Sequence, residues 1–355
     1  MKLSDILEKQ HYKPSECIQL SADADLIVEE KLLQHPAYWQ EYVDNLNFNQ
    51  GCFFTSIEGK ERLVEFEAFP LMAKRMFSDE GKLYAEVFPG LPMQVQVESF
   101  QYDDFDRFVC LSKNKSFPIG LTDSAQNDFF NVCDDFDDDS FRFDGKHYEM
   151  KDLFEPSNSR NEDFWSAKYK SGNIGFDMKG PHPFLVKNLD QFKFLKSRVL
   201  VLGCGRAHDA EYFARQGHIV TAVDISPKAI EAAKALYPES ANLKYEQQDI
   251  LNLPNSFYNK YDIIWDHTFY CAIPPKHRQE LVKLWSKCLS EKGRLLGIFF
   301  SMYKPEGPPF GGSELELRSR LSKYFRIHYW NRVMEGPVSR LGKEFFCMLE
   351  KLETD

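Results

Sequence analysis

The chain has 355 residues, of which 43% are hydrophobic, and its net charge is −10. This apolar content suffices for folded cores and is too high for a disordered chain, and the length suggests two domains. No stretch resembles the roughly 18 apolar residues of a membrane span, and the acidic excess disfavours general nucleic-acid binding. We therefore expect a soluble, cytoplasmic protein that binds neither a membrane nor nucleic acid.

The charge is divided unevenly along the chain. Residues 1–155 hold 15 basic and 31 acidic side chains, whereas residues 156–355 hold 29 basic and 23 acidic ones. Opposite net charges in the two halves indicate two separate domains. The eight cysteines form no Cys-x-x-Cys pair, so no zinc ribbon is predicted. The acidic run 134–139 lacks the glycine and spaced ligands of a calcium loop, and we interpret it as a solvated turn, with no metal site expected.

The N-terminal half changes its hydrophobic period near residue 50. Apolar residues such as Ile6, Ile27 and Leu33 predict helix over residues 1–45. From residue 52 to 150, stretches such as LVEFEAF and MQVQVESF alternate in hydrophobicity, which is typical of strands. Asp144-Gly145 predicts a hairpin over residues 141–148. No internal repeat is evident. Residues 1–155 are thus expected to form an α+β domain, with a linker at residues 154–163.

The C-terminal half alternates strands with helices. Strands are predicted at residues 198–202, 219–224, 243–247, 261–265, 294–300, 325–330 and 345–349, with helices at 207–216, 228–236 and 278–289. Strands separated by helices imply a parallel sheet covered by helices on both faces. We expect an α/β, Rossmann-like domain over residues 156–355.

A glycine loop joins the first strand and helix of this domain. Gly203 and Gly205 allow a sharp turn and close approach of a ligand. Asp224 ends the next strand, where a carboxylate can accept both hydroxyls of a ribose, and Asp249 follows the third strand, where it can meet an adenine. The expected contacts in this nucleoside crevice are Gly203, Cys204, Gly205, Asp224, Ile225, Asp249 and Ile250.

The third glycine of a dinucleotide-binding loop is missing, because His208 occupies its position. This counts against a pyrophosphate, which needs close approach to the helix N-terminus, and so against a nicotinamide oxidoreductase. S-adenosylmethionine has no phosphate and tolerates the change. A glycine turn without any ligand is the alternative.

Five segments make residues 164–350 resemble the thiopurine S-methyltransferase family, and its plant halide and thiol methyltransferase branch more than the thiopurine enzymes. Residues 164–177 resemble the aromatic segment that folds over the cofactor, 202–209 the glycine loop, and 223–226 the acidic strand end. Residues 264–273 resemble the fourth strand and its active-site loop, and Gly307-Pro-Pro-Phe310 resembles the loop after strand five.

The resemblance implies a class I methyltransferase that uses S-adenosyl-L-methionine. Its acceptor would be a small soft nucleophile, a thiol first, or a sulfide or halide-like anion, which suits an aromatic cavity. Further candidate cofactor contacts are Trp165, Tyr169, Phe176, Asp177 and Asp266; candidate catalytic residues are His267, Asp266 and Tyr270, and candidate pocket residues Phe269 and Phe310.

Several alternatives stay open at this point. His267 stands where thiopurine enzymes carry Arg, and it is a base, a cationic anchor or a loop histidine bonded to backbone. Asp177 contacts the cofactor's amino group or caps a helix. Arg206 and His208 face the cofactor's carboxylate or solvent. The protein methylates oxygen or nitrogen instead of sulfur, or binds the cofactor without turnover.

Overall fold

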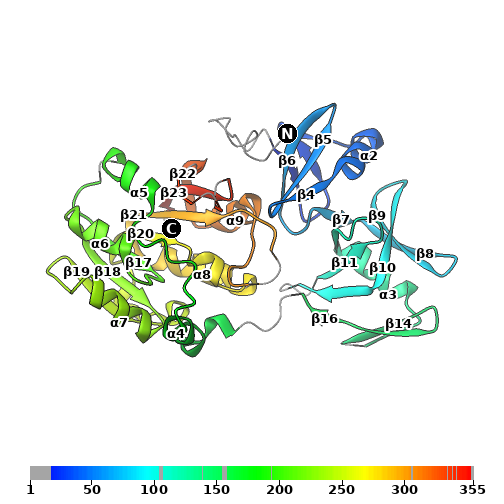
Figure 1. Ribbon diagram of the computed structural model, residues 1–355. Helices are drawn as coiled ribbons and strands as arrows, with labels where there is room; N and C mark the ends of the chain where they lie inside the picture. The colour runs from blue at the N-terminus through cyan, green and yellow to red at the C-terminus, as the bar shows by residue number, and fades with distance from the viewer. Residues whose placement is uncertain are drawn as a thin grey trace. The chain divides into compact units, whose positions relative to one another are not determined.

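The computed structural model describes residues 17–103, 107–137, 139–153, 158–192, 194–304, 307–333, 335–337, 339–340 and 342–352. They divide into two compact units (Figure 1). The first unit takes the described residues of 1–156, 302–306 and 312–319, and the second those of 157–301, 307–311 and 320–355. Two short segments of the C-terminal half, 302–306 and 312–319, thus belong to the first unit, which no sequence pattern indicated.

The first unit is rich in strands, as expected. Its elements are β1 (Ile18–Leu20), β2 (Leu26–Val28), β3 (Lys31–Leu32), α2 (Pro36–Asn45), β4 (Asn47–Asn49), β5 (Cys52–Ile57), β6 (Lys60–Phe66), β7 (Leu71–Ala73), β8 (Arg75–Asp79), β9 (Lys82–Phe88), β10 (Leu91–Tyr102), β11 (Phe108–Ser112), β12 (Pro118–Leu121), α3 (Asp123–Val132), β13 (Asp135–Asp137), β14 (Ser140–Phe143), β15 (Lys146–Glu149) and β16 (Lys151–Asp152). The prediction of helix over residues 1–45 holds for α2 only. Residues 1–16 lie outside the described residues, and residues 18–32 form short strands whose buried apolar side chains alternate.

Two parts of this unit share one order of elements, which the sequence did not reveal. The antiparallel strands β1–β3 are followed by α2 and the antiparallel meander β4–β6, and β6 returns to pair parallel with β1. The antiparallel strands β10–β12 are followed by α3 and the antiparallel meander β13–β15, and the next strand, β16, pairs parallel with β10. Both parts thus share the order β-β-β-α-β-β-β, but the parallel partner of the first strand is the sixth strand, β6, in one part and an additional seventh strand, β16, in the other; β7–β9 lie between the two parts in the chain.

Three hairpins of the first unit turn through an acidic residue and glycine. The pairs are Glu58–Gly59, Glu80–Gly81 and Asp144–Gly145, with φ values of 54° and 71°, 47° and 70°, and 50° and 71°. Two successive positive φ values define the tight turns that match the twist of antiparallel strands. The hairpin predicted at residues 141–148 is confirmed.

The second unit alternates strands and helices. Its elements are η2 (Asn158–Arg160), α4 (Glu162–Ser171), α5 (Pro183–Asn188), η3 (Leu189–Phe192), β17 (Arg198–Leu202), α6 (His208–Arg215), β18 (Ile219–Asp224), α7 (Pro227–Leu236), β19 (Leu243–Gln247), η4 (Ile250–Asn252), η5 (Asn255–Phe257), β20 (Tyr261–His267), η6 (Tyr270–Ala272), α8 (Pro275–Cys288), β21 (Leu289–Phe300), β22 (Phe325–Arg332) and β23 (Glu344–Lys351); α9 (Glu314–Leu321) begins in the first unit. The predicted linker 154–163 is partly wrong, because η2 and the start of α4 lie within it.

One seven-stranded sheet holds the second unit together, with the order β19-β18-β17-β20-β21-β23-β22. The first five strands are parallel and β23 is antiparallel to both its neighbours. The central strand β17 is buried along almost its whole length because helices cover the sheet. This is the Rossmann-like class I methyltransferase fold, as predicted. The carboxyl ends of the parallel strands share one edge, where ligands bind in such sheets.

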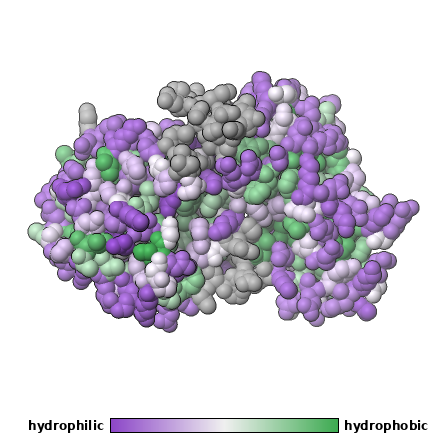
Figure 2. All heavy atoms as spheres, in the orientation of Figure 1, coloured by the Kyte–Doolittle hydropathy of each residue, from purple (hydrophilic) through white to green (hydrophobic). Residues whose placement is uncertain are grey.

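Hydrophilic residues cover most of the visible face in Figure 2, with apolar residues in smaller groups between them. Among the described helices, none is long and apolar enough to cross a membrane.

Candidate active site

A cavity of about 450 Å³ opens at the carboxyl edge of the parallel strands of the second unit. Its volume lies in the range typical of small-molecule sites. Its wall comes from the ends of β17, β18 and β20, from α4 and residues 173–180, and from Pro308, Pro309 and Arg340. Every described residue of this wall belongs to the second unit.

The glycine loop after β17 leaves room for a ligand. Gly203 and Gly205 both have φ of +53°, a conformation that favours glycine. A Cβ at Gly203 would lie 2.5 Å from the Phe269 ring, and one at Gly205 would lie 2.9 Å from the Tyr169 hydroxyl. Larger residues at either position would therefore narrow the cavity floor.

Asp224 closes the other side of this loop. Its Oδ2 accepts from the Gly205 N–H at 2.9 Å and its Oδ1 accepts from the Ser226 N–H at 2.9 Å. Burial raises the pKa of Asp224 to about 6, although the two N–H donors oppose this shift. Asp224 lines the cavity, and each of its oxygens has a second lone pair, so the carboxylate can accept from the two hydroxyls of a ribose.

Three aromatic side chains from α4 and the following loop line the cavity together with the glycine loop and Asp224. Trp165 and Tyr169 both contact the Phe176 ring edge-on, with centroids 5.8 Å and 6.1 Å away. The Trp165 indole N–H donates to the Ser159 carbonyl at 2.6 Å, which fixes the ring. Aromatic faces suit an adenine and a sulfonium cation, so the wall fits S-adenosylmethionine.

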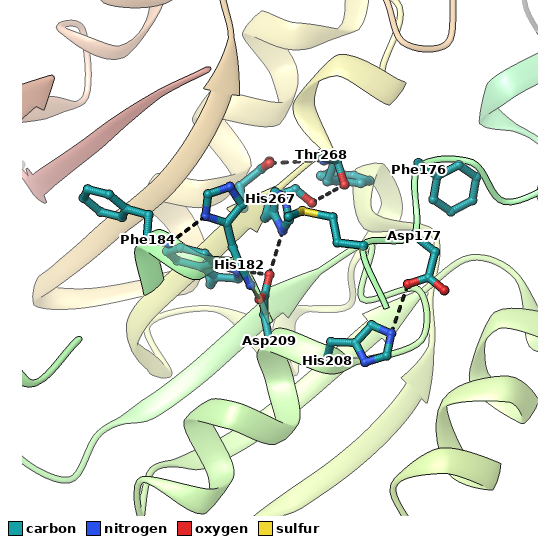
Figure 3. Close-up of polar contacts among 12 residues, drawn as sticks. Phe176, Asp177, His182, Phe184, His208, Asp209, His267 and Thr268 are labelled. Atoms are coloured by element: carbon teal, nitrogen blue, oxygen red, sulfur yellow. Dashed lines mark hydrogen bonds and ion pairs between the residues drawn. The ribbon is translucent and has the colours of Figure 1, made fainter. Parts of the chain in front are cut away.

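Asp177 joins the glycine loop to this aromatic cover. Its carboxylate accepts from Arg206 Nη1 at 2.9 Å and lies 3.0 Å from His208 Nε2 (Figure 3). The helix cap considered for Asp177 is excluded, because α5 begins at Pro183 and His182 caps it. Arg206 and His208 both line the cavity, and their side chains are 31% and 13% exposed.

His267 ends β20 and projects toward Asp209 of α6 (Figure 3). His267 Nδ1 lies 2.8 Å from Asp209 Oδ2, and Nε2 lies 3.4 Å from Arg340 Nη1. Asp209 also accepts from the His182 N–H at 2.7 Å and from the Trp265 indole at 2.9 Å. His267 thus makes side-chain contacts on both ring nitrogens, and its imidazole borders the cavity.

A second charged cluster lies behind His267. His182 Nε2 is 3.4 Å from Glu344 Oε2, and Arg340 Nη1 donates to Glu344 Oε1 at 3.2 Å. Ligand atoms of His182, His267 and Glu344 all lie within 4.8 Å of one another, which is compatible with a metal site. The Arg340 guanidinium already lies beside Glu344 and His267, however, and its charge would repel a metal cation.

Three predicted site residues do not reach the cavity wall. Asp266 is 0% exposed, and its Oδ1 accepts from the N–H groups of Phe269 and Tyr270 at 3.2 Å each. Tyr270 is buried against Trp285 and Phe299. Phe310 is buried too, and its N–H donates to the Cys271 carbonyl at 2.7 Å. These three residues lie outside the lining of the cavity, where their hydrogen bonds and packing support the loop after β20 and the segment that carries Pro308 and Pro309.

The remaining predicted site residues do line the cavity: Trp165, Tyr169, Phe176, Asp177, Gly203, Cys204, Gly205, Asp224, Ile225, Asp249, Ile250, His267 and Phe269. Asp209 and Arg340 also line the cavity, but they were not predicted from the sequence, and neither was the supporting pair His182 and Glu344. The signal for Asp209 was its position in the chain: it directly follows His208 and lies in the first turn of α6. Arg340 lies between β22 and β23, and no local pattern marks it.

The comparisons with known proteins agree with this geometry. Residues 160–344, just over half of the chain, match the family model "Thiopurine S-methyltransferase (TPMT)". "Probable thiol methyltransferase 2" of Arabidopsis thaliana is 28% identical over 167 residues, which cover 45% of this chain and 72% of that protein. Thiopurine S-methyltransferase of Panthera leo is 28% identical over 193 residues, covering 48% and 78%. A structure of Burkholderia thailandensis 1,6-didemethyltoxoflavin-N1-methyltransferase has a TM-score of 0.44 at 20% identity, covering 55% of this chain and 88% of that one. The chain belongs to the thiopurine S-methyltransferase family and is an S-adenosylmethionine-dependent methyltransferase.

Proposed function

We propose that this enzyme transfers a methyl group from S-adenosylmethionine to the sulfur of a small thiol. The cavity has room for both molecules, and its two ends differ in chemistry. The cofactor end consists of the glycine loop, Asp224 and the aromatic cover. His267, Arg340, Phe300, Pro308 and Pro309 form the acceptor end.

At the cofactor end, each polar group has a counterpart on S-adenosylmethionine. Asp224 accepts the ribose hydroxyls, and Asp249, which follows β19, lies on the adenine side. Asp177 and Arg206 offer opposite charges, 2.9 Å apart, to the amino and carboxylate groups of the methionine part. When bound, S-adenosylmethionine supplies a methyl group on a sulfonium sulfur, which needs no further activation.

One observation at the acceptor end carries the proposal. The groups that border it include a cation, Arg340, and an imidazole, His267. The nearby carboxylates of Asp209 and Glu344 are occupied by His267, Trp265 and Arg340. Such a site favours an acceptor that reacts as an anion, such as a thiolate, and disfavours a protonated amine.

The apolar residues of the acceptor end raise the reactivity of the acceptor. Phe300, Pro308 and Pro309 exclude water from the acceptor, and a soft anion stripped of water is a stronger nucleophile. The chain then has only to hold the sulfur in line with the methyl group, at about 3–3.5 Å, and such alignment can supply several kcal/mol. Sulfide and halide-like anions satisfy the same requirements.

A panel of acceptors with labelled S-adenosylmethionine tests the proposal. It would include alkyl and aryl thiols, sulfide, iodide and thiocyanate, with a catechol and a primary amine for comparison. We expect the highest kcat/KM on a thiol. Turnover of the catechol or the amine without turnover of any thiol, sulfide or halide would contradict it.

A further inference from the structure

The hydrogen bonds of His267 define its tautomer. Its Nδ1 faces Asp209 Oδ2 at 2.8 Å. Burial by itself raises the pKa of Asp209, but the facing imidazole and the N–H donors of His182 and Trp265 lower it to about 2. An ionised carboxylate only accepts, so Nδ1 of His267 carries the hydrogen and donates it.

In the neutral ring, the second nitrogen of His267 is therefore a lone-pair acceptor. Its neighbour is Arg340 Nη1 at 3.4 Å, and a guanidinium only donates. A contact of 3.4 Å is long for such a bond, so an acceptor group can compete for Nε2. The His267 side chain is 11% exposed and borders the acceptor end of the cavity.

The hydrogen bonds and the ring packing of His182 support the contact between His267 and Asp209. His182 donates its backbone N–H to Asp209 Oδ1 at 2.7 Å, and its ring packs edge-on against His267, with centroids 4.8 Å apart. His182 Nδ1 accepts from the Phe184 N–H at 3.1 Å, so its Nε2 carries the hydrogen toward Glu344. The charged and titratable groups around His267 include Asp209, His182, Arg340, Glu344 and Asp266.

We propose that Asp209 and His267 form a general-base dyad that lets the enzyme use thiols that arrive protonated. This inference rests on the proposed function. His267 Nε2 takes the proton of the acceptor S–H as the sulfur forms its bond to the methyl carbon, and the bond from that carbon to the sulfonium sulfur breaks. The products are a methyl thioether, neutral S-adenosylhomocysteine and an imidazolium, which Asp209 stabilises and which returns its proton to solvent. His267 is the catalytic residue and Asp209 a positioning residue.

The consequence is a dependence on the acidity of the acceptor. The thiolate is the reactive form of a thiol, so an acceptor that is already ionised gains nothing from a base. An alkyl thiol, largely protonated at neutral pH, should depend strongly on the dyad. An aryl thiol, largely ionised there, should depend on it weakly.

The first test compares kcat/KM of His267→Gln and Asp209→Asn on one alkyl and one aryl thiol. General-base catalysis typically contributes about 10²–10⁴-fold, so we expect His267→Gln to lose about 100-fold or more on the alkyl thiol and less than about fivefold on the aryl thiol. Asp209→Asn should show the same contrast with a loss of about tenfold or more. Equal losses on both acceptors would overturn the dyad, because they would mean that His267 only binds the acceptor.

His218→Gln and Asp262→Asn are matched controls. His218 is a buried histidine that accepts from the Ser197 N–H at 3.2 Å, and Asp262 pairs with Arg198 at 2.7 Å. Neither lines the cavity. Both variants should keep the wild-type ratio of alkyl to aryl turnover.

A second test needs no turnover. Nitrogen-15 NMR of the full chain with S-adenosylhomocysteine reports which nitrogen of His267 is protonated. We expect a protonated Nδ1 and a bare Nε2 in the neutral ring, and a changed tautomer balance in Asp209→Asn. A proton on Nε2 of the neutral ring would overturn the dyad. If no thiol is methylated by the wild-type enzyme, the proposed function fails, and the NMR result still decides the state of His267.

Discussion

The two units of the chain differ in what their topology brings together. In the second unit, five parallel strands end at one edge, so loops from distant parts of the sequence meet there. In the first unit, most neighbouring strands are antiparallel and joined by short turns, so their loops are shared between opposite edges. The wall of the cavity comes from the second unit throughout its described residues. A parallel sheet can therefore gather a site from scattered residues in a way that meanders do not.

The units also differ in what they bury. The first unit fills its core with aromatic rings, such as Phe100 and Phe129, stacked with centroids 4.2 Å apart. The second unit buries carboxyl groups at its functional edge, and burial raises the pKa of Asp224 to about 6 and that of Asp266 to about 7. Perturbed carboxyl groups of this kind are typical of functional sites. Folding stability and ligand binding thus make opposite demands on the second unit.

We propose that the two units fold independently of each other. The variant with the largest expected effect tests this proposal. Phe129→Ala removes a fully buried ring and should lower the unfolding free energy of the first unit by about 3–5 kcal/mol. The affinity for S-adenosylhomocysteine should stay within about twofold of wild type. Denaturant unfolding followed by hydrogen exchange, with calorimetric titration of the ligand, measures both.

Phe213→Ala is the matched variant of the second unit, since Phe213 is also fully buried. It should destabilise the second unit by a similar amount and leave the exchange rates of the first unit unchanged. Loss of ligand binding in Phe129→Ala, without global unfolding, would mean that the units depend on each other.

The next largest effect concerns the cofactor end. Asp224→Ala removes the acceptor of the Gly205 and Ser226 N–H groups, and with it the acceptor that we propose for two ribose hydroxyls. Hydrogen bonds to charged groups contribute about 1.5–3 kcal/mol, so calorimetry should show S-adenosylhomocysteine binding weakened by about 10- to 100-fold. Asp262→Ala, at the opposite end of the sheet, should bind as wild type. Equal affinities of Asp224→Ala and wild type would exclude Asp224 from the cofactor site.

A smaller effect follows from the pKa of Asp224. Its value of about 6 in the folded protein lies above the ordinary 3.8, so the folded state binds this proton more tightly than the unfolded chain. As pH falls from 6 toward 4, protonation of Asp224 therefore adds to the stability of the ligand-free protein, and ionisation at higher pH removes that contribution.

Ligand binding should respond in the opposite direction. The ionised carboxylate is the stronger acceptor, so the affinity for S-adenosylhomocysteine should fall about tenfold between pH 7.5 and pH 5. Calorimetric titration across this range, with Asp224→Asn as the control, measures the change. A wild-type profile as flat as that of Asp224→Asn would contradict the assigned pKa.

Features that depend on residues close together in the sequence could be predicted, whereas features that depend on residues far apart in the sequence could not. Strand bounds such as Arg198–Leu202 and Ile219–Asp224 are confirmed residue by residue, because each strand is a short apolar run between turn residues. The cavity-lining residues Gly203, Asp224 and Asp249 could be predicted for the same reason, since they lie at or just after strand ends. Arg340 and Glu344 could not be found this way, because only the pairing of β23 with β21 brings them to the site.

The errors have physical causes as well. Residues 18–32 were predicted as helix from apolar residues such as Ile27, yet they form two- and three-residue strands that pair with one another, and β1 also pairs with β6. Asp266 was predicted to orient the methionine part of the cofactor, and Tyr270 was predicted from its place in a loop. Successive residues of a strand face opposite sides of the sheet, so Asp266 does not share the direction of its neighbour His267.

The smallest expected effect compares two glycines that both have positive φ. A Cβ at Gly59 would meet nothing within 4 Å, so Gly59→Ala should cost only the backbone strain, about 1 kcal/mol, in the first unit. A Cβ at Gly203 would press on Phe269, so Gly203→Ala should also weaken the binding of S-adenosylhomocysteine. Thermal unfolding measures the stability of each variant, and calorimetry measures its affinity for S-adenosylhomocysteine. Equal effects on ligand binding would contradict the division between the units.

The central claim is that the cavity of the second unit directs a methyl group to sulfur. The most direct measurement offers the enzyme one carbon skeleton with three nucleophiles, 2-mercaptoethanol, ethanolamine and ethylene glycol, together in one reaction with labelled S-adenosylmethionine. Mass spectrometry of the products counts the methyl groups on sulfur, nitrogen and oxygen. We predict that the label is found on sulfur, with at least a hundredfold preference over the other two atoms. Label on nitrogen or oxygen in equal or greater amount would contradict the claim.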